Sequence, residues 1–221
     1  MMRLVLAAIA VALPQRAKHL LYRWYFKWDV HPTARIGASL LLVDRATISE
    51  GVNVSHFNVI KGLEQLTLEQ GAALGAFNWI SGPSRASGAF PRSPERSPSL
   101  HMGPEAAIAM RHVIDCTDKV TFEPLSILGG MRSQILTHAA DIHRNELVTE
   151  PVVIGEASLV FSGCILLAGC RVPPRSVVAA GAVVDRDLGE ELQVYGGVPA
   201  RALKPLDPGN AYVNREKGLI S

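Results

Sequence analysis

Aliphatic residues recur every six positions along much of the chain. Residues 151–186 divide into the hexads PVVIGE, ASLVFS, GCILLA, GCRVPP, RSVVAA and GAVVDR, and the fourth position of each is Ile, Leu or Val. Small residues follow four positions later, at Ser158, Cys164, Cys170, Ser176 and Ala182. Neither the period of a helix nor that of a strand produces this spacing, so the pattern predicts a structural repeat.

The same aliphatic phase runs through the earlier part of the chain, with two slips. Its members are Ile36, Leu42, Ile48, Val54, Ile60 and Leu66, then Leu68, Leu74 and Ile80, then Met102, Ile108 and Ile114, and finally Cys116, Phe122 and Leu128. A six-residue period predicts a triangular coil, in which each short strand contributes one inward side chain. Stacked coils bury a continuous column that one coil alone cannot bury, and small residues suit the corners.

Two segments interrupt the repeat. Residues 81–100 are rich in Ser, Pro, Gly and Arg, and residues 129–150 contain the cluster THAADIHRN. Both are predicted to be loops extruded from the coil. The first carries Arg85, Arg92 and Arg96, so it is either a solvated loop or a lid over an anionic ligand. The expected organisation is a helical segment at 1–30, a coil domain at 31–206 and a tail at 207–221.

The N-terminal segment has an apolar and a basic part. Leu4 to Leu13 are apolar, but this stretch is too short to cross a bilayer. Basic residues then alternate with large apolar ones, at Arg16, Lys18, Arg23 and Lys27. A helix that caps the end of the coil, an amphipathic contact with a membrane surface and a cleaved signal peptide all remain open.

The composition is that of a globular chain. The 221 residues carry a net charge of +2, with 48% hydrophobic and 19% charged residues. This near-neutral charge argues against nucleic acid as the main partner. Cys116, Cys164 and Cys170 are odd in number and lack CxxC spacing, which favours free thiols in a reducing compartment. We therefore expect a cytoplasmic protein, with a peripheral position at the inner membrane surface as one option.

Three stretches resemble a known family. VVAAGAVVDRDL and the following YGGVPARALKPL are similar to the end of the hexapeptide-repeat acyltransferases, and the resemblance extends over roughly residues 31–206. RHVIDCTDKVTFEPLSILGGMRSQILTH resembles a subgroup of O-acetyltransferases. The resemblance implies an all-β fold, the left-handed parallel β-helix, and a homotrimer with clefts between its subunits. It also implies transfer of an acetyl group from acetyl-coenzyme A to a hydroxyl, with a sugar or polysaccharide precursor as the expected acceptor.

Such a transfer needs a base, because a sugar hydroxyl is a poor nucleophile at neutral pH. Histidine suits this role, and a nearby carboxylate fixes its tautomer. His138 is the expected base, and His112 and His143 remain alternatives. Asp141 is the local candidate for orienting the ring, with Asp115, from the stretch HVIDCTD, as its rival.

The candidate coenzyme-binding residues also follow from the resemblance. Family members hold the pantetheine arm with backbone amides at coil corners, and the matching stretches here are FSGC and AAGA. The candidate residues are Ser162, Gly163, Ala180 and Gly181. Arg201 and Lys204 are candidates for the coenzyme phosphates. No metal is expected.

Two other functions remain open. Carbonic anhydrases of the gamma class share this fold, and His138 and His143 have the five-residue spacing of their zinc ligands. His101 or His112 would then supply a third ligand, and three histidines with water form a valid zinc site. A scaffold or sugar-binding β-helix without catalysis is the remaining alternative.

Overall fold

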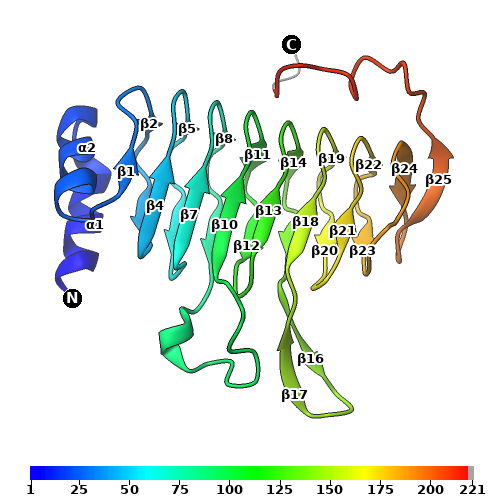
Figure 1. The fold of residues 1–221 in the computed structure, drawn as a ribbon, viewed down its shortest axis with the longest axis horizontal. Coiled ribbons are helices and arrows are strands. Elements are labelled where there is room, and N and C mark those ends of the chain that lie inside the picture. The colour runs from blue at the N-terminus through cyan, green and yellow to red at the C-terminus, as the bar shows by residue number, and fades with distance from the viewer. Residues whose placement is uncertain (219–221) are drawn as a thin grey trace.

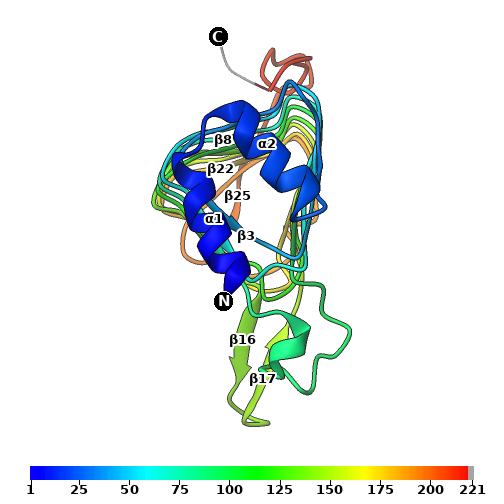
Figure 2. The same cartoon turned by 90° about the vertical axis from the view of Figure 1, so that its left-hand side faces the viewer.

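The chain winds into a triangular prism of stacked coils, and a computed structural model describes residues 1–218 of it (Figure 1). Three parallel sheets form the sides, and a view along the prism shows the triangular cross-section (Figure 2). We call them faces A, B and C, in the order in which the chain visits them. The chain turns between them at the A–B, B–C and C–A corners.

Each face is a sheet of short strands, one from each coil. Face A contains β1 (Asp29–Val30), β4 (Arg45–Ile48), β7 (Gln65–Leu68), β10 (Ser99–Met102), β13 (Val120–Phe122), β18 (Val152–Ile154) and β21 (Arg171–Val172). Face B contains β2 (Arg35–Ile36), β5 (Asn53–Val54), β8 (Ala73–Leu74), β11 (Ala107–Met110), β14 (Ile127–Met131), β19 (Leu159–Val160), β22 (Val177–Val178), β24 (Gln193–Gly196) and β25 (Arg201–Pro205). Face C contains β3 (Leu40–Leu42), β6 (Val59–Lys61), β9 (Trp79–Ser81), β12 (Val113–Asp115), β15 (Gln134–Ile135), β20 (Ile165–Leu166) and β23 (Val183–Val184).

Nearly all of the positions in the six-residue phase are side chains that fill the prism. Its members from Ile36 to Val184 are buried, with one exception. The phase predicted Leu42 as an inward residue, but Leu41 is buried and Leu42 is only half-buried. β3 consists of three consecutive leucines, so hydrophobicity alone could not select between them. The small residues at 158, 164, 170, 176 and 182 are also buried.

The two slips in the phase arise from longer coils in the middle of the prism. Ile36 pairs with Val54, 18 positions later, whereas Val54 pairs with Leu74, 20 positions later. The two additional residues lie on face A, where the strands of the longer coils turn two side chains inward. Leu66 and Leu68 of β7 are an example, since both are fully buried.

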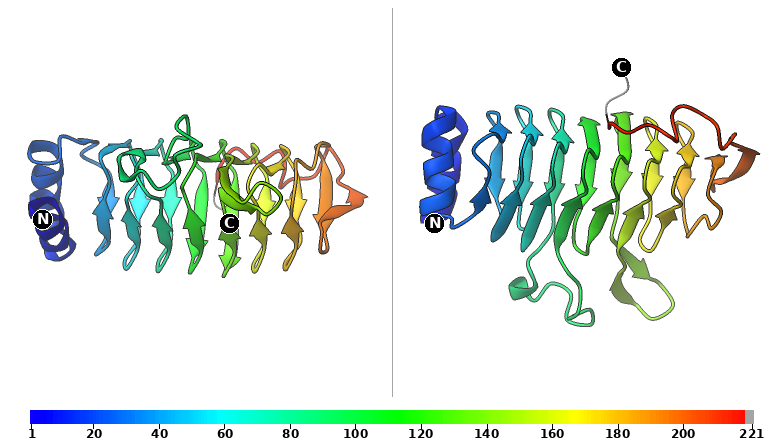
Figure 3. Two further views of the ribbon diagram at one scale, coloured as in Figure 1. Left: turned by 90° about the horizontal axis from the view of Figure 1, so that it is seen from below. Right: turned by 45° about the horizontal axis from the view of Figure 1, so that its top comes forward.

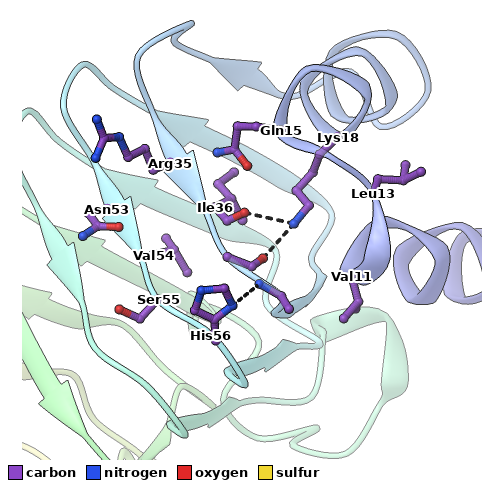
Figure 4. Close-up of a pocket in the computed structure, with 12 residues that line it drawn as sticks. Val11, Leu13, Gln15, Lys18, Arg35, Ile36, Asn53, Val54, Ser55 and His56 are labelled. Carbon is purple, nitrogen blue, oxygen red and sulfur yellow. Dashed lines mark hydrogen bonds between the residues drawn. The ribbon is translucent and has the colours of Figure 1, made fainter.

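Two helices close the N-terminal end of the prism, α1 (Met2–Ala12) and α2 (Gln15–Trp24) (Figures 1 and 2). α2 is fixed to the first coil by Lys18, which is buried and whose Nζ donates to the carbonyls of Ile36 and Gly37 at 2.9 and 2.8 Å (Figure 4). The structure therefore shows the helical cap that the sequence suggested. No helix in residues 1–218 combines the length and the apolar character that a membrane crossing requires.

The C-terminal segment returns along the prism. β25 pairs antiparallel with β24, and the chain then runs back beside the coils (Figure 1). Tyr212 packs on Ile127 and Leu159 of face B, and the Arg215 guanidinium donates to the carbonyl of Ala157 at 3.2 Å. The tail therefore contacts the coils between residues 212 and 218, and residues 219–221 of it lie outside the described residues.

Two insertions leave the prism at the same C–A corner and lie side by side (Figures 1 and 3). The first is residues 82–98, with the short 3-10 helix η1 (Arg85–Ser87). The second is residues 136–151, an antiparallel hairpin of β16 (His138–Asp141) and β17 (Glu146–Thr149). The sequence placed the second break at 129, but β14 and β15 continue the coil as far as Ile135.

Candidate active site

A histidine and an aspartate from adjacent coils meet where the hairpin leaves the C–A corner. Asp115 is the last residue of β12, and His138 is the first residue of β16, just after β15. β12 and β15 are neighbours on face C, so the two side chains are brought together by the stacking of coils. His138 Nδ1 lies 2.8 Å from Asp115 Oδ2. This contact makes Nδ1 the protonated nitrogen of a neutral ring and leaves the Nε2 lone pair for substrate.

Asp115 is held rigidly by other donors. Its Oδ1 accepts from the backbone N–H and the hydroxyl of Thr117 at 3.0 and 2.6 Å, and its Oδ2 accepts from the backbone N–H of Thr137 at 2.9 Å. Burial by itself would raise the pKa of Asp115. The hydrogen bonds from Thr117, His138 and Thr137 outweigh burial and lower the pKa, so the carboxylate is charged at neutral pH.

The pair opens on a cavity of about 570 Å³. It is lined by face C with its C–A corner, by the first insertion and by the first residue of the hairpin, at Leu42, Lys61, Gly62, Ser81, Gly82, Pro83, Phe90, Asp115, Thr117 and His138. The imidazole is half-exposed, whereas only 15% of the Asp115 side chain is exposed. A ring that is accessible on one edge and held by a buried carboxylate on the other has the arrangement of a general base.

The first insertion shapes this cavity with Phe90. The ring centroids of Phe90 and His138 lie 5.6 Å apart in an edge-to-face arrangement. Phe90 is supported by Arg96, whose guanidinium lies 5.1 Å from the centroid of the phenyl ring. Arg96 is itself buried and donates to the carbonyls of Pro83, Thr117 and Ser84. The insertion is therefore a braced structure that positions an aromatic ring beside the imidazole.

The arginines of this insertion all have partners within the chain. Arg85 forms hydrogen bonds to the Glu64 carboxylate, and Arg92 forms an ion pair with Glu146 of the hairpin. The Arg96 guanidinium donates to the three backbone carbonyls described above. The sequence left open a solvated loop or a lid over an anionic ligand. In the structure the three arginines hold the insertion to the prism and to the hairpin.

Asp141 and His143 lie in the hairpin away from the imidazole. Asp141 is three positions after His138 in the same strand, so their side chains point to opposite faces. The Asp141 Oδ1 accepts from the backbone N–H groups of His143 and Arg144 in the turn, at 2.9 and 3.1 Å. Of the two carboxylates considered, the structure therefore brings Asp115 to His138 and leaves Asp141 as a residue that stabilises the turn.

His112 lies inside the prism, in a column of stacked polar residues at the B–C corner. The column is fully or almost fully buried and consists of Ser39, Asn58, Asn78, His112 and Ser133. The His112 backbone N–H donates to Asn78 Oδ1 at 2.9 Å, and its Nδ1 accepts from the backbone N–H of Ser133 at 3.2 Å. Burial lowers the pKa of His112 to about 4. These are the properties of a neutral structural residue.

The candidate coenzyme corners lie on another edge of the prism. Ser162 and Gly163 follow β19, and Ala180 and Gly181 follow β22, so both pairs are at the B–C corner. They stack directly, since the Gly181 N–H donates to the Ser162 carbonyl at 3.0 Å. Gly181 has a φ of +75° and faces open space. Face C separates this corner from His138, so a single chain does not bring the two sets together.

Arg201 and Lys204 are both exposed in β25, near the end of the prism. The Arg201 Nη1 lies 3.5 Å from Asp185 Oδ1 and donates to the carbonyl of Ala200 at 2.6 Å. Lys204 lies in the antiparallel pairing of β25 with β24, opposite Val194. The structure thus places these two cations away from the dyad.

A second cavity, of about 700 Å³, lies beneath the helical cap. Gln15, Lys18, Arg35 and His56 are among its lining residues (Figure 4). The His56 Nδ1 accepts from the backbone N–H of Ala38 at 3.0 Å. None of the residues that line this cavity belongs to the sequence-based site, and it contains no paired histidine and carboxylate.

The cysteines and the other histidines do not form a second site. All three thiols are free and buried, and burial raises the pKa of Cys170 to about 12, which disfavours a thiolate. His101 pairs with Glu69 on face A, with Nε2 and Oε1 2.6 Å apart. Within residues 1–218, no three histidine, cysteine or acidic side chains are grouped to hold a metal ion. The zinc alternative required His138 and His143 to converge with His101 or His112, and the structure does not assemble them.

No protein-family model and no curated protein matches the sequence, but solved structures do. A polysialic acid O-acetyltransferase aligns with a TM-score of 0.66 and 16% identity, over 85% of this chain and 92% of that one. A variant N-acyltransferase from Bacillus cereus, in complex with dTDP-4-amino-4,6-dideoxyglucose and coenzyme A, aligns with a TM-score of 0.51 and 14% identity, over 86% and 89%. A hexapeptide-repeat acetyltransferase from Vibrio cholerae O1 biovar eltor, in complex with acetyl-coenzyme A, aligns with a TM-score of 0.50 and 18% identity, over 93% and 88%. These likenesses confirm the predicted fold, a left-handed parallel β-helix with a short helical segment at its N-terminus.

Proposed function

We propose that this protein is an acyltransferase that moves an acetyl group from acetyl-coenzyme A to a hydroxyl of a sugar or polysaccharide precursor. The observation that carries the proposal is the His138–Asp115 pair at the mouth of a cavity. The fold adds support, because structural neighbours include a polysialic acid O-acetyltransferase and an acetyltransferase crystallised with acetyl-coenzyme A. A non-catalytic scaffold would not need an oriented, accessible imidazole.

The proposed reaction uses one histidine and no covalent enzyme intermediate. His138 Nε2 removes the proton of the acceptor hydroxyl while the oxygen attacks the thioester carbonyl carbon. The negatively charged Asp115 stabilises the imidazolium that forms. When the tetrahedral intermediate collapses, the C–S bond breaks and the coenzyme thiolate takes the proton from the imidazolium. The products are an acetyl ester and the free thiol of coenzyme A.

The acceptor occupies the cavity in this proposal, and Phe90 is the residue that contacts it. Sugar rings present an apolar face of C–H groups that packs well against an aromatic side chain. The bracing by Arg96 keeps Phe90 in place without an ordering cost on binding. Lys61 and Ser81 provide polar groups at the same cavity for acceptor hydroxyls.

The coenzyme arm then comes from the B–C corner of a second subunit. The B–C corner and the outer side of face C carry exposed apolar side chains, at Phe57, Phe77, Trp79, Val113, Met131 and Phe161. Phe57 and Phe77 stack with ring centroids 5.0 Å apart. A homotrimer that buries this strip would bring the Ser162 and Ala180 corners of one subunit toward His138 of the next.

A screen of acceptors tests the proposal. Purified protein is incubated with acetyl-coenzyme A and a panel of sugars, oligosaccharides and amino sugars, and products are identified by mass and by hydroxylamine lability, which distinguishes esters from amides. We expect ester products on a carbohydrate acceptor. Amide products on amino sugars alone would assign N-transfer instead. No coenzyme binding by calorimetry would refute an acyltransferase.

A further inference from the structure

The outer side of the helical cap is an exposed apolar surface. α1 turns Met2, Val5 and Ile9 outward, with 68%, 51% and 49% of their surface exposed. α2 adds Leu20 and Trp24, at 58% and 73%. Both helices lie across the end of the prism (Figure 2). We call this surface the cap face and include in it the exposed basic residues discussed below.

Packing against the prism does not account for these residues. α1 buries only the small side chains of Ala7 and Ala10, and α2 buries Lys18 and Tyr22. The outward residues of α2 follow helical spacing on the opposite side, with Leu20 and Trp24 four positions apart. Large apolar side chains on both helices therefore remain available for a partner.

The charge of the cap face has one sign. Residues 1–28 contain five Lys and Arg residues and no Asp or Glu. Arg3 is paired with Asp44, and Lys18 is buried. Arg16, Arg23 and Lys27 are exposed, and none of them forms an ion pair within residues 1–218. Arg16 and Arg23 lie in α2 with Leu20 and Trp24, and Lys27 follows three residues after the helix.

We propose that the cap face docks on the surface of a lipid bilayer with anionic headgroups. Amphipathic helices with Trp and Leu beside Arg and Lys lie in the plane of such an interface, and the cations attract the anionic lipids. Packing of the cap face on a second copy is disfavoured, because it would bring six unpaired cations together. This inference does not rest on the proposed function.

The docked orientation follows from where the cap lies. The helices close one end of the prism, so the coils stand away from the bilayer. β15, which precedes His138, is the fifth strand of face C counted from the cap. At a strand spacing of about 4.8 Å, the dyad lies roughly 20 Å or more from the membrane surface.

Vesicle flotation with the intact protein tests the inference. The protein is mixed with phosphatidylcholine vesicles, with or without about 30 mol% phosphatidylserine, and the bound fraction is measured. Two variants remove the exposed apolar side chains and the exposed cations of the cap face separately. One is Leu20→Ser with Trp24→Ser, and the other is Arg16→Glu with Arg23→Glu and Lys27→Glu. Matched controls change exposed residues elsewhere, Ile142→Ser at the hairpin tip and Arg175→Glu on the prism.

We expect the parent to bind the phosphatidylserine vesicles. Each cap variant should reduce the bound fraction by about tenfold or more, whereas each control should stay within about twofold of the parent. High salt should weaken binding of the parent, because screening shortens the reach of the cations. Thermal melts establish that the variants are folded. Absence of binding to the anionic vesicles, or equal binding by parent and both cap variants, would overturn the proposal. A lower mass of the Leu20→Ser, Trp24→Ser variant in sedimentation, without vesicle binding by the parent, would assign the cap face to self-association.

Discussion

Replacement of His112 by Asn tests whether this histidine has a structural or a catalytic role. His112 is fully buried, and its Nδ1 accepts a hydrogen bond from the backbone N–H of Ser133. Two residues of the same column, Asn58 and Asn78, are asparagines whose Oδ1 atoms accept from the next coil in the same manner. An Asn at 112 should continue this ladder, so the variant is expected to fold. It lacks a group that titrates near neutral pH.

The effect of pH on the free energy of unfolding follows from the pKa of His112. Unfolded histidine binds a proton below its ordinary pKa of 6.5, whereas the folded protein binds one at His112 only below about 4. Between these values the unfolded state holds more protons, so the stability contributed by the neutral ring is lost as pH falls from 6.5 toward 4. At about pH 5 the expected loss is about 2 kcal/mol relative to neutral pH, and the limit at lower pH is about 3 kcal/mol.

Urea unfolding at fixed protein concentration measures this difference. The free energy of unfolding is determined for parent and His112→Asn at about pH 7.5 and about pH 5, and the pH effect in one is subtracted from that in the other. Between these two pH values the free energy of unfolding of the parent should fall by about 2 kcal/mol more than that of the variant. The variant should retain acetyl transfer at neutral pH. Equal pH effects would refute the buried neutral ring. A folded variant without transfer activity would make His112 the base.

Three further predictions concern the cavity and the assembly. Asp115→Asn should lower kcat by at least about 10²-fold with little change in acetyl-coenzyme A affinity, since the amide cannot hold the imidazole tautomer, and steady-state kinetics with calorimetry would check this. Phe90→Ala should raise the KM for the acceptor by about tenfold and leave coenzyme affinity unchanged, and an unchanged acceptor KM would remove Phe90 from the acceptor site. Phe77→Glu should convert a trimer to folded monomers in sedimentation velocity, whereas Ile142→Glu at the hairpin tip should not, and a monomeric parent with full activity would contradict the shared cleft.

The coil was predictable from sequence because a six-residue period is a local signal. Each inward position repeats within a few residues. The pattern selected the wrong residue in β3, since three adjacent leucines satisfy it, and it missed β15, which the sequence assigned to the second loop. The slips were visible but unexplained. They reflect longer coils in which strands such as β7 turn both Leu66 and Leu68 inward.

The partner of His138 was harder to predict, because it depends on contacts between coils. Asp141 was the nearer carboxylate in sequence, but residues three apart in a strand diverge. Asp115 meets the imidazole from 23 positions earlier. The signal that favoured Asp115 was its separation from His138 by about one coil, because side chains about one coil apart lie next to each other. Ile114 of β12 pairs with Ile135 of β15, 21 positions later. Phe90 and Arg96 had no such signal, since their insertion follows no period.

Acetyl transfer by the His138→Ala variant tests the central claim most directly. The rate of acetyl transfer to the acceptor identified by the screen is measured for parent and variant, with acetyl-coenzyme A affinity determined in parallel. The account predicts a rate lowered by about 10² to 10⁴-fold and an unchanged coenzyme affinity, because the imidazole acts only on the acceptor proton. Transfer at the parent rate by folded His138→Ala would contradict it.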